Sequence, residues 1–126
     1  MRAAEVVDVA PGLWLWRREY PDWRPRPDWG PAVASTCVES RGEVAVIDPL
    51  APPEDATELW ERLDARPPTL AIVLKPDHVR DVDLFVRRYG ARGFGPRLYF
   101  RHDIPETELE PFEQRDELPG GFLGLY

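Results

Sequence analysis

The sequence predicts an α/β fold in which one mixed sheet is covered on one face by two helices. Residues 53–66 and 78–89 each carry a single apolar stripe at helical spacing. The segment 70–74 between them is apolar throughout, as in a strand buried on both faces. Because each helix has only one apolar face, it can cover only one layer. We therefore expect both helices on the same side of a sheet of about five to seven strands.

The part of the chain before the first helix is typical of strands and turns. Residues 4–18 predict two short strands around the turn Pro11-Gly12. Residues 33–39 and 43–48 predict a hairpin with a glycine in its turn. The intervening stretch 19–31 is rich in proline, which fixes φ and removes hydrogen-bond donors, so it predicts an extended loop.

Both helices have recognisable boundaries. The helix at 53–66 has a proline and two acidic residues in its first turn, and two consecutive prolines follow its end. The second helix ends before Gly90, the position of a helix-terminating glycine, and Asp77 stands where an N-cap residue is expected. Two strand-like segments, 91–94 and 97–100, come next.

The order of these segments resembles the N-terminal half of the metallo-β-lactamase superfamily. Residues 70–81 form the strand, polar loop and helix start in which that superfamily carries its H-x-H-x-D-H zinc motif. Four further segments are similar to other strands and turns of the family: residues 9–14, 37–49, 90–96 and 117–121. The resemblance implies an αββα half-sandwich and a metal-dependent hydrolase. It also implies one domain, residues 1–126, that lacks the C-terminal part of the family's domain.

The zinc motif is degenerate in this chain. Placing His78 on the second histidine of the motif puts Pro76, Arg80 and Asp81 on the other ligand positions. Proline has no side-chain donor atom and arginine is not deprotonated in proteins, so only one of the four ligand types remains. We therefore predict no dinuclear zinc centre and no bound cofactor, with zinc in a mononuclear site as the alternative.

Two interpretations of the motif residues remain open. In the functional one, Asp77, His78 and Asp81 keep a catalytic role. A metal ion would then draw on His78, Asp81, His102 and Asp103, because histidine with carboxylates can bind Zn, Fe or Mn. In the structural one, Asp77 caps the helix that begins at His78, and Asp81 is stabilised by the helix dipole or pairs with a neighbouring cation.

The resemblance also implies roles outside the motif. Asp48 ends a strand at the point where the family uses an aspartate to brace the motif loop. The family's loop after the first strands lies beside its active-site cleft, so Trp23 and Trp29 could bind an apolar substrate; alternatively they fold back over the core. Lys75 could bind an anionic group of a substrate, or be a solvated residue at a strand end.

Composition excludes several classes of partner. The formal charge of −7 at pH 7 argues against a nucleic-acid partner, because binding to phosphates requires cationic side chains. No apolar run approaches the roughly 20 residues of a membrane span, and no secretory signal is recognisable, so we expect no membrane partner. Cys37 lies in an apolar stretch, where a packed core thiol is expected. We expect a cytoplasmic protein of bacterial origin.

The predicted half-sandwich leaves one face of its sheet uncovered. A complete domain of the resembled superfamily packs two such halves sheet to sheet, so we expect a homodimer, or another subunit, to cover the exposed face. Two classes of function remain open: a metal-dependent hydrolase with a mononuclear or oligomer-completed site, and a non-catalytic module for binding or assembly. Fold alone does not determine function, and the degenerate motif favours the second class.

Overall fold

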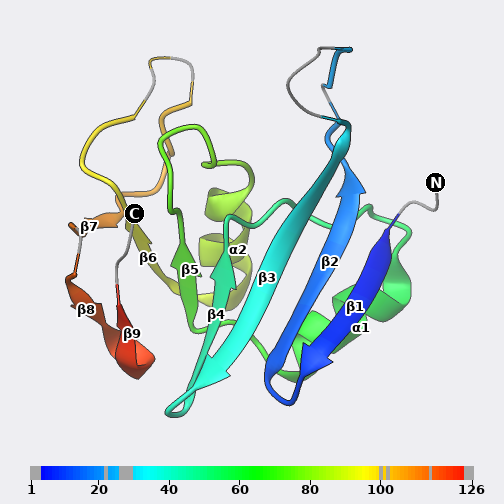
Figure 1. Cartoon of the computed structure of the whole chain (residues 1–126), viewed down its shortest axis with the longest axis horizontal. Helices are drawn as coiled ribbons and strands as arrows, with labels where there is room; N and C mark the ends of the chain where they lie inside the picture. Colours follow the sequence, from blue (N-terminus) through cyan, green and yellow to red (C-terminus); the bar gives the residue numbers. More distant parts are fainter. Residues whose placement is uncertain are drawn as a thin grey trace.

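A computed structural model describes most of the chain: residues 4–21, 23–25, 30–99, 101, 103–113 and 115–123. Within these residues, seven strands form one mixed sheet in chain order (Figure 1). The strands are β1 (Glu5–Ala10), β2 (Leu13–Glu19), β3 (Ala32–Ser40), β4 (Glu43–Ile47), β5 (Leu70–Ile72), β6 (Arg92–Gly95) and β7 (Glu110–Pro111). A smaller two-stranded sheet is formed by β8 (Glu117–Leu118) and β9 (Phe122–Leu123), with the short 3-10 helix η1 (Pro119–Gly121) between them.

The connections explain the change from antiparallel to parallel pairing. Strands β1 to β4 pair antiparallel. Tight turns join β1 to β2 and β3 to β4, and each uses a glycine with positive φ, Gly12 at 73° and Gly42 at 80°. Strands β4 to β6 pair in parallel, which requires crossovers, and these are α1 (Thr57–Ala65) and α2 (Val82–Tyr89). No helix in the described part of the chain is long and apolar enough to cross a membrane.

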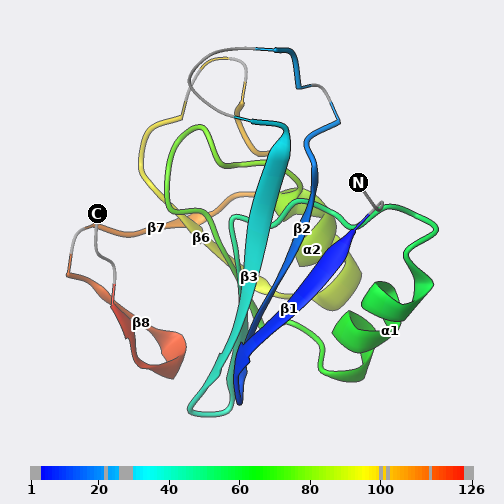
Figure 2. The same cartoon turned by 45° about the vertical axis from the view of Figure 1, so that its right-hand side comes forward.

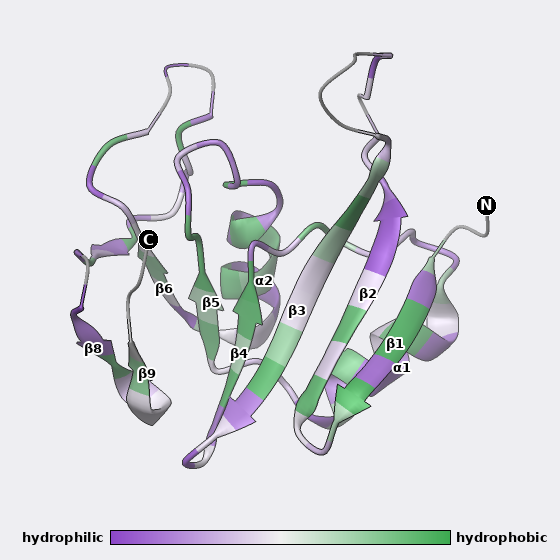
Figure 3. Cartoon of the chain, in the orientation of Figure 1, coloured by the Kyte–Doolittle hydropathy of each residue, from purple (hydrophilic) through white to green (hydrophobic). Residues whose placement is uncertain are grey.

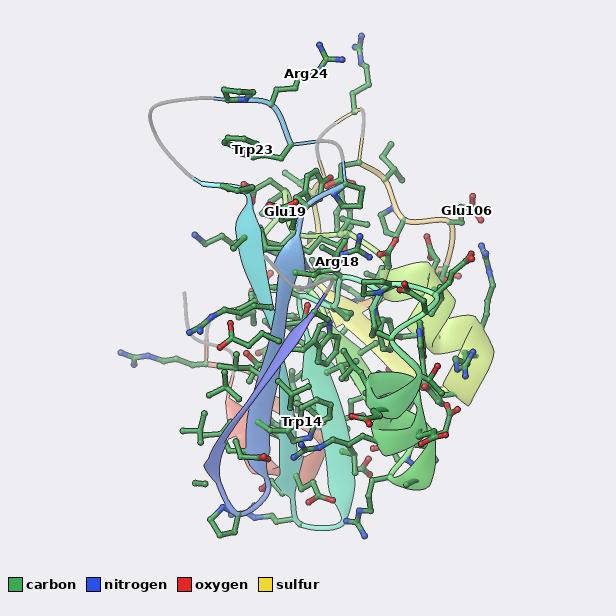
Figure 4. All side chains as sticks on the ribbon, turned by 90° about the vertical axis from the view of Figure 1, so that its right-hand side faces the viewer. Trp14, Arg18, Glu19, Trp23, Arg24 and Glu106 are labelled. Carbon is green, nitrogen blue, oxygen red and sulfur yellow. The ribbon has the colours of Figure 1, made fainter. Side chains whose placement is uncertain are left out.

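Both helices lie on the same face of the sheet (Figure 2), which confirms the predicted fold class. Trp16 stands at the centre of this layer. Its ring stacks on Phe85 of α2 at 6.1 Å between centroids, and its indole Nε1 donates a hydrogen bond of 2.9 Å to the carbonyl of Leu50. Trp14 lies on the same side, under the guanidinium of Arg62 of α1 (Figure 4). The apolar stripes of both helices therefore pack into one hydrophobic core.

Cys37 is buried in this core, as predicted. Burial raises the pKa of its thiol to about 11. The thiol is therefore protonated at neutral pH and packs as a small apolar group.

The opposite face of the sheet is covered over only part of its width. Over β4 to β6, the C-terminal segment covers the sheet, and Phe112 and Leu118 pack on Leu70, Ile72 and Phe94. Figure 3 shows that β5, and β4 after Glu43, are apolar, as burial on both faces requires. Over β1 to β3 this face is open, and it carries half-buried apolar side chains that alternate with the core residues: Val7, Leu13, Leu15 and Val38.

Some predicted boundaries are wrong. The first helix begins at Thr57 rather than at residue 53, because consecutive prolines and a turn precede it. The second begins at Val82 rather than at His78. Arg80 adopts a φ of 43°, a left-handed conformation that no helix can continue through. Residues 97–99 form no strand.

Candidate functional site

The centre of the candidate site is a hydrogen bond between two segments that are distant in the sequence. Asp48 follows the end of β4, and His78 lies in the loop between β5 and α2. The imidazole Nδ1 of His78 lies 2.9 Å from Oδ2 of Asp48. The other carboxylate oxygen of Asp48 accepts a hydrogen bond of 2.8 Å from the backbone N–H of Leu74. Asp48 therefore holds the motif loop at both its start and its middle.

The backbone conformation of Asp48 and a backbone hydrogen bond fix the position of its side chain. It adopts a left-handed φ of 50° and is buried. Its N–H donates to the carbonyl of Ile72 at 2.8 Å. An ionised carboxylate only accepts hydrogen bonds, so Nδ1 of a neutral His78 carries the proton and Nε2 is left as an acceptor. Among the described residues, none bonds to this Nε2.

Arg80 is bound to the scaffold. Its Nη1 donates to the carbonyl of Ala34 at 3.0 Å and to the carbonyl of Asp48 at 2.7 Å. Burial lowers the pKa of the Arg80 guanidinium, and the charge of Asp48 opposes that effect. Arginine remains protonated under such conditions. The side chain thus connects the loop to β3 and to the end of β4 while keeping its charge.

Asp81 is also engaged by the backbone. Its Oδ2 accepts a hydrogen bond of 2.7 Å from the N–H of Ala51, and its own N–H donates to the carbonyl of Pro49 at 3.0 Å. It therefore bonds the segment after β4 rather than pairing with Arg80 or Lys75. The predicted N-cap role of Asp77 is wrong, because α2 begins five residues later at Val82 and the turn at Arg80 intervenes.

A cavity of about 540 Å³ lies beside this loop. Its walls come from the loop after β2, the start of β3 and the motif loop, and its lining residues are Tyr20, Gly30, Ala32, Val33, Ala34, Asp77, His78 and Arg80. Of the predicted catalytic residues, the structure thus brings Asp77 and His78 to the cavity. Asp81 is not part of its lining.

The remaining predicted site residues are dispersed. Asp103 lies within electrostatic range of Asp77 and His78: burial and the charge of Asp77 raise the pKa of its carboxyl, while a hydrogen bond with the backbone of Val79 and the nearby His78 lower it. Lys75 is exposed and does not line the cavity.

The structure describes one of the two tryptophans that are predicted to bind a substrate. Trp23 is half-buried in the loop beyond the end of β2 (Figure 4), and its backbone N–H donates to the carbonyl of Tyr20 at 3.1 Å. It is not part of the lining of the cavity. Trp29 and His102 lie outside the described residues.

The side chains at the motif positions do not fit a dinuclear metal centre. Pro76 and Arg80 have no ligand atom to offer. Oδ2 of Asp81 accepts the hydrogen bond of the Ala51 amide, and Asp81 is not part of the lining of the cavity. Within the described residues, no group of three or more His, Cys, Asp or Glu side chains is placed to hold a metal ion.

Two polar residues of the cavity, Tyr20 and Arg80, are not predicted as binding residues by the sequence. Arg80 is indicated only as a replaced metal ligand and as a possible ion-pair partner of Asp81, and no pattern singles out Tyr20. The partner of Arg80 on β3, Ala34, lies 46 residues earlier in the chain. A contact through a backbone carbonyl leaves no side-chain signature, so no sequence pattern could have indicated it.

Comparison with known proteins supports the fold. No protein-family model matches the chain, and no curated protein matches it by sequence. Among solved structures, the chain is similar to a metallo-β-lactamase from Erythrobacter litoralis, with a TM-score of 0.51 and 14% sequence identity. The match covers 78% of this chain and 42% of that protein, so the chain spans less than half of its length. The chain therefore has a fold that is distantly similar to that of a metallo-β-lactamase.

Proposed function

We propose that this chain is a non-catalytic binding module that keeps a metallo-β-lactamase-like scaffold but has a degenerate metal site. The observation that carries the proposal is the engagement of two motif positions by the backbone. Arg80 donates to two carbonyls, and Asp81 accepts from the Ala51 amide. Arg80 has no lone pair to offer a metal ion. The bond to Ala51 holds the Asp81 carboxylate at the segment after β4, and Asp81 is not part of the lining of the cavity.

The cavity beside the loop supports a binding role. Its volume of about 540 Å³ lies in the range of small-molecule sites, roughly 300–1,000 Å³. It combines small apolar side chains of β3 with three polar groups of the motif loop, Asp77, His78 and Arg80. Such a mixture of an apolar wall and a few converging polar groups is typical of ligand sites.

A mononuclear metal-dependent hydrolase is the second candidate, and one observation favours it. Histidines that ligate metals usually donate their second ring nitrogen to a carboxylate, and His78 has this arrangement with Asp48. A metal ion at Nε2 would need further ligands, and Asp77 and Asp103 are the nearby carboxylates. A single imidazole provides little metal affinity by itself.

Metal analysis separates the two candidates. The purified protein is dialysed against buffer containing Zn, Mn or Fe, then against metal-free buffer, and its metal content is measured. We expect far less than one ion per chain, both in the unmodified protein and in the His78→Ala variant. A stoichiometric ion that disappears in His78→Ala, but not in a matched Lys75→Ala control, would overturn the proposal in favour of the hydrolase.

A further inference from the structure

We propose that the cavity beside the motif loop binds a small zwitterion, namely an α-amino acid with an apolar side chain. The inference rests on the proposed function, because it requires a cavity that is not occupied by a metal centre. It is carried by one juxtaposition: a cationic and an anionic side chain, Arg80 and Asp77, line the same cavity. No ion pair joins these two side chains in the described part of the chain, so each charge can serve a ligand.

The guanidinium of Arg80 presents a free edge for a carboxylate. Both contacts with the carbonyls of Ala34 and Asp48 use Nη1. The edge formed by Nε and Nη2 has no acceptor among the described residues. This edge carries two parallel N–H donors, the geometry in which arginine binds a carboxylate through two hydrogen bonds. Because Nη1 is already anchored, little side-chain entropy is lost when the ligand binds.

The acceptors for an ammonium group lie on the same loop. Asp77 is exposed and lines the cavity. His78 also lines it, and its Nδ1 is bound to Asp48, so Nε2 of the neutral ring can accept a hydrogen bond. An ammonium group has three donors, which one carboxylate and one imidazole nitrogen can engage.

The balance of charge excludes a simple anion. Two carboxylates, those of Asp48 and Asp77, lie near the guanidinium of Arg80. A ligand with only a negative group would gain one favourable partner and meet two repulsive ones. A zwitterion places its ammonium among the carboxylates and its carboxylate on Arg80. The side chain of the ligand would contact the apolar residues of β3 that line the cavity: Ala32, Val33 and Ala34.

Calorimetric titration with three matched compounds tests the proposal. Leucine carries both charges, N-acetylleucine keeps only the carboxylate, and leucinamide keeps only the ammonium. We expect saturable binding of leucine, and affinities at least roughly tenfold lower for each blocked compound, because each loses charge-assisted hydrogen bonds. Equal affinity for leucine and either blocked compound would overturn the proposal.

Two variants test which side chain binds the ammonium group of the ligand and which binds its carboxylate. We expect Asp77→Asn to weaken leucine binding by roughly tenfold but not that of N-acetylleucine, which lacks the ammonium group and loses a repulsive carboxylate. Asp55→Asn, which removes an exposed carboxylate outside the cavity, should change neither. Arg80→Lys should weaken both, and its thermal unfolding is compared because Arg80 also holds the scaffold. The Asp77→Asn variant tests the binding site while Arg80 and its bonds to the scaffold are kept.

Metal analysis of the same samples separates the two possible failures. Metal-free protein that does not bind leucine at concentrations up to about 10 mM overturns this inference and leaves the proposed function in place. Stoichiometric metal overturns the proposed function, and the zwitterion site with it.

Discussion

The two halves of the main sheet differ in how their faces are covered. Strands β4 to β6 are buried on both sides, by the helices on one and by the C-terminal segment with Phe112 and Leu118 on the other. Strands β1 to β3 are covered only on the helix side. Their other side, which faces the viewer in Figure 1, leaves Val7, Leu15 and Val38 partly exposed.

The pairing geometry of the strands alone does not account for the distribution of apolar residues on the two halves. Parallel strands are normally apolar on both faces, and β4 and β5 follow that rule. Antiparallel strands with one solvated face normally place polar residues there. On β1 to β3 the outward residues are largely apolar, so this half has the composition of a covered surface without a cover within the described chain.

The largest effect is expected from truncating the cover of the buried half. Phe112→Ala should lower the free energy of unfolding by about 3–5 kcal/mol, because a buried phenylalanine is replaced by a cavity. Leu15→Ala on the open half should cost about 1 kcal/mol, since Leu15 is only partly buried. Urea unfolding at low protein concentration measures both. Equal losses in the free energy of unfolding for the two variants would mean that the two halves of the sheet are covered to the same extent.

The second prediction concerns what covers the open half, and we expect a second copy of this chain. The surface of 7961 Å² exceeds the roughly 6,900 Å² typical of a monomer of 14.5 kDa. The excess, roughly 1,000 Å², is close to the approximately 800 Å² that each partner of a standard interface buries.

Light scattering at micromolar concentration tests this expectation. The chain should be a dimer, and Leu15→Glu should convert it to a monomer by burying a charge in the interface. Glu58→Gln, a change on the exposed surface of α1, serves as the control and should remain dimeric. A stable monomer before any substitution would show that the open half needs no partner.

A smaller effect is expected in the motif loop. His78→Ala should lower the free energy of unfolding by about 1–3 kcal/mol, because the buried carboxylate of Asp48 loses one of its two side-chain hydrogen bonds. Lys75→Ala, an exposed neighbour without an ion pair among the described residues, should change it by less than about 0.5 kcal/mol. Thermal unfolding compares the two. If His78→Ala left the free energy of unfolding unchanged, the hydrogen bond between His78 and Asp48 would not stabilise the loop.

The smallest effect concerns pH. Burial, with the charge of Asp77, raises the pKa of Asp103 above its ordinary value of 3.8, so the folded state binds this proton more tightly than the unfolded state. The stability contributed by this group therefore falls as the pH rises from 3.8 through the raised value. Asp103→Asn keeps an acceptor for the Val79 amide, so we expect a slightly higher melting temperature at neutral pH and no such gain in acid. A gain that is independent of pH would exclude the titration of Asp103 as its cause.

The order and type of the elements around the site could be predicted from the sequence. The hairpin, the buried strand and the two amphipathic helices depend on periodicities that lie within single segments. The start of α2 could not be predicted, because the left-handed turn at Arg80 is stabilised by bonds to Ala34 and Asp48, far earlier in the chain. Without those partners, His78 and Asp81 fit the first turn of a helix equally well.

The α/β class and the single face occupied by both helices follow from the sequence alone. What Arg80 and Asp81 bind depends on the tertiary structure. Arg80 and Asp81 bond backbone groups that lie 46 and 30 residues away, at Ala34 and Ala51. Backbone carbonyls and amides are the same at every residue, so a side chain that binds one leaves no sign of its partner in the sequence. The cavity between Tyr20 and the motif loop likewise exists only after β3 and β5 are paired into one sheet through β4.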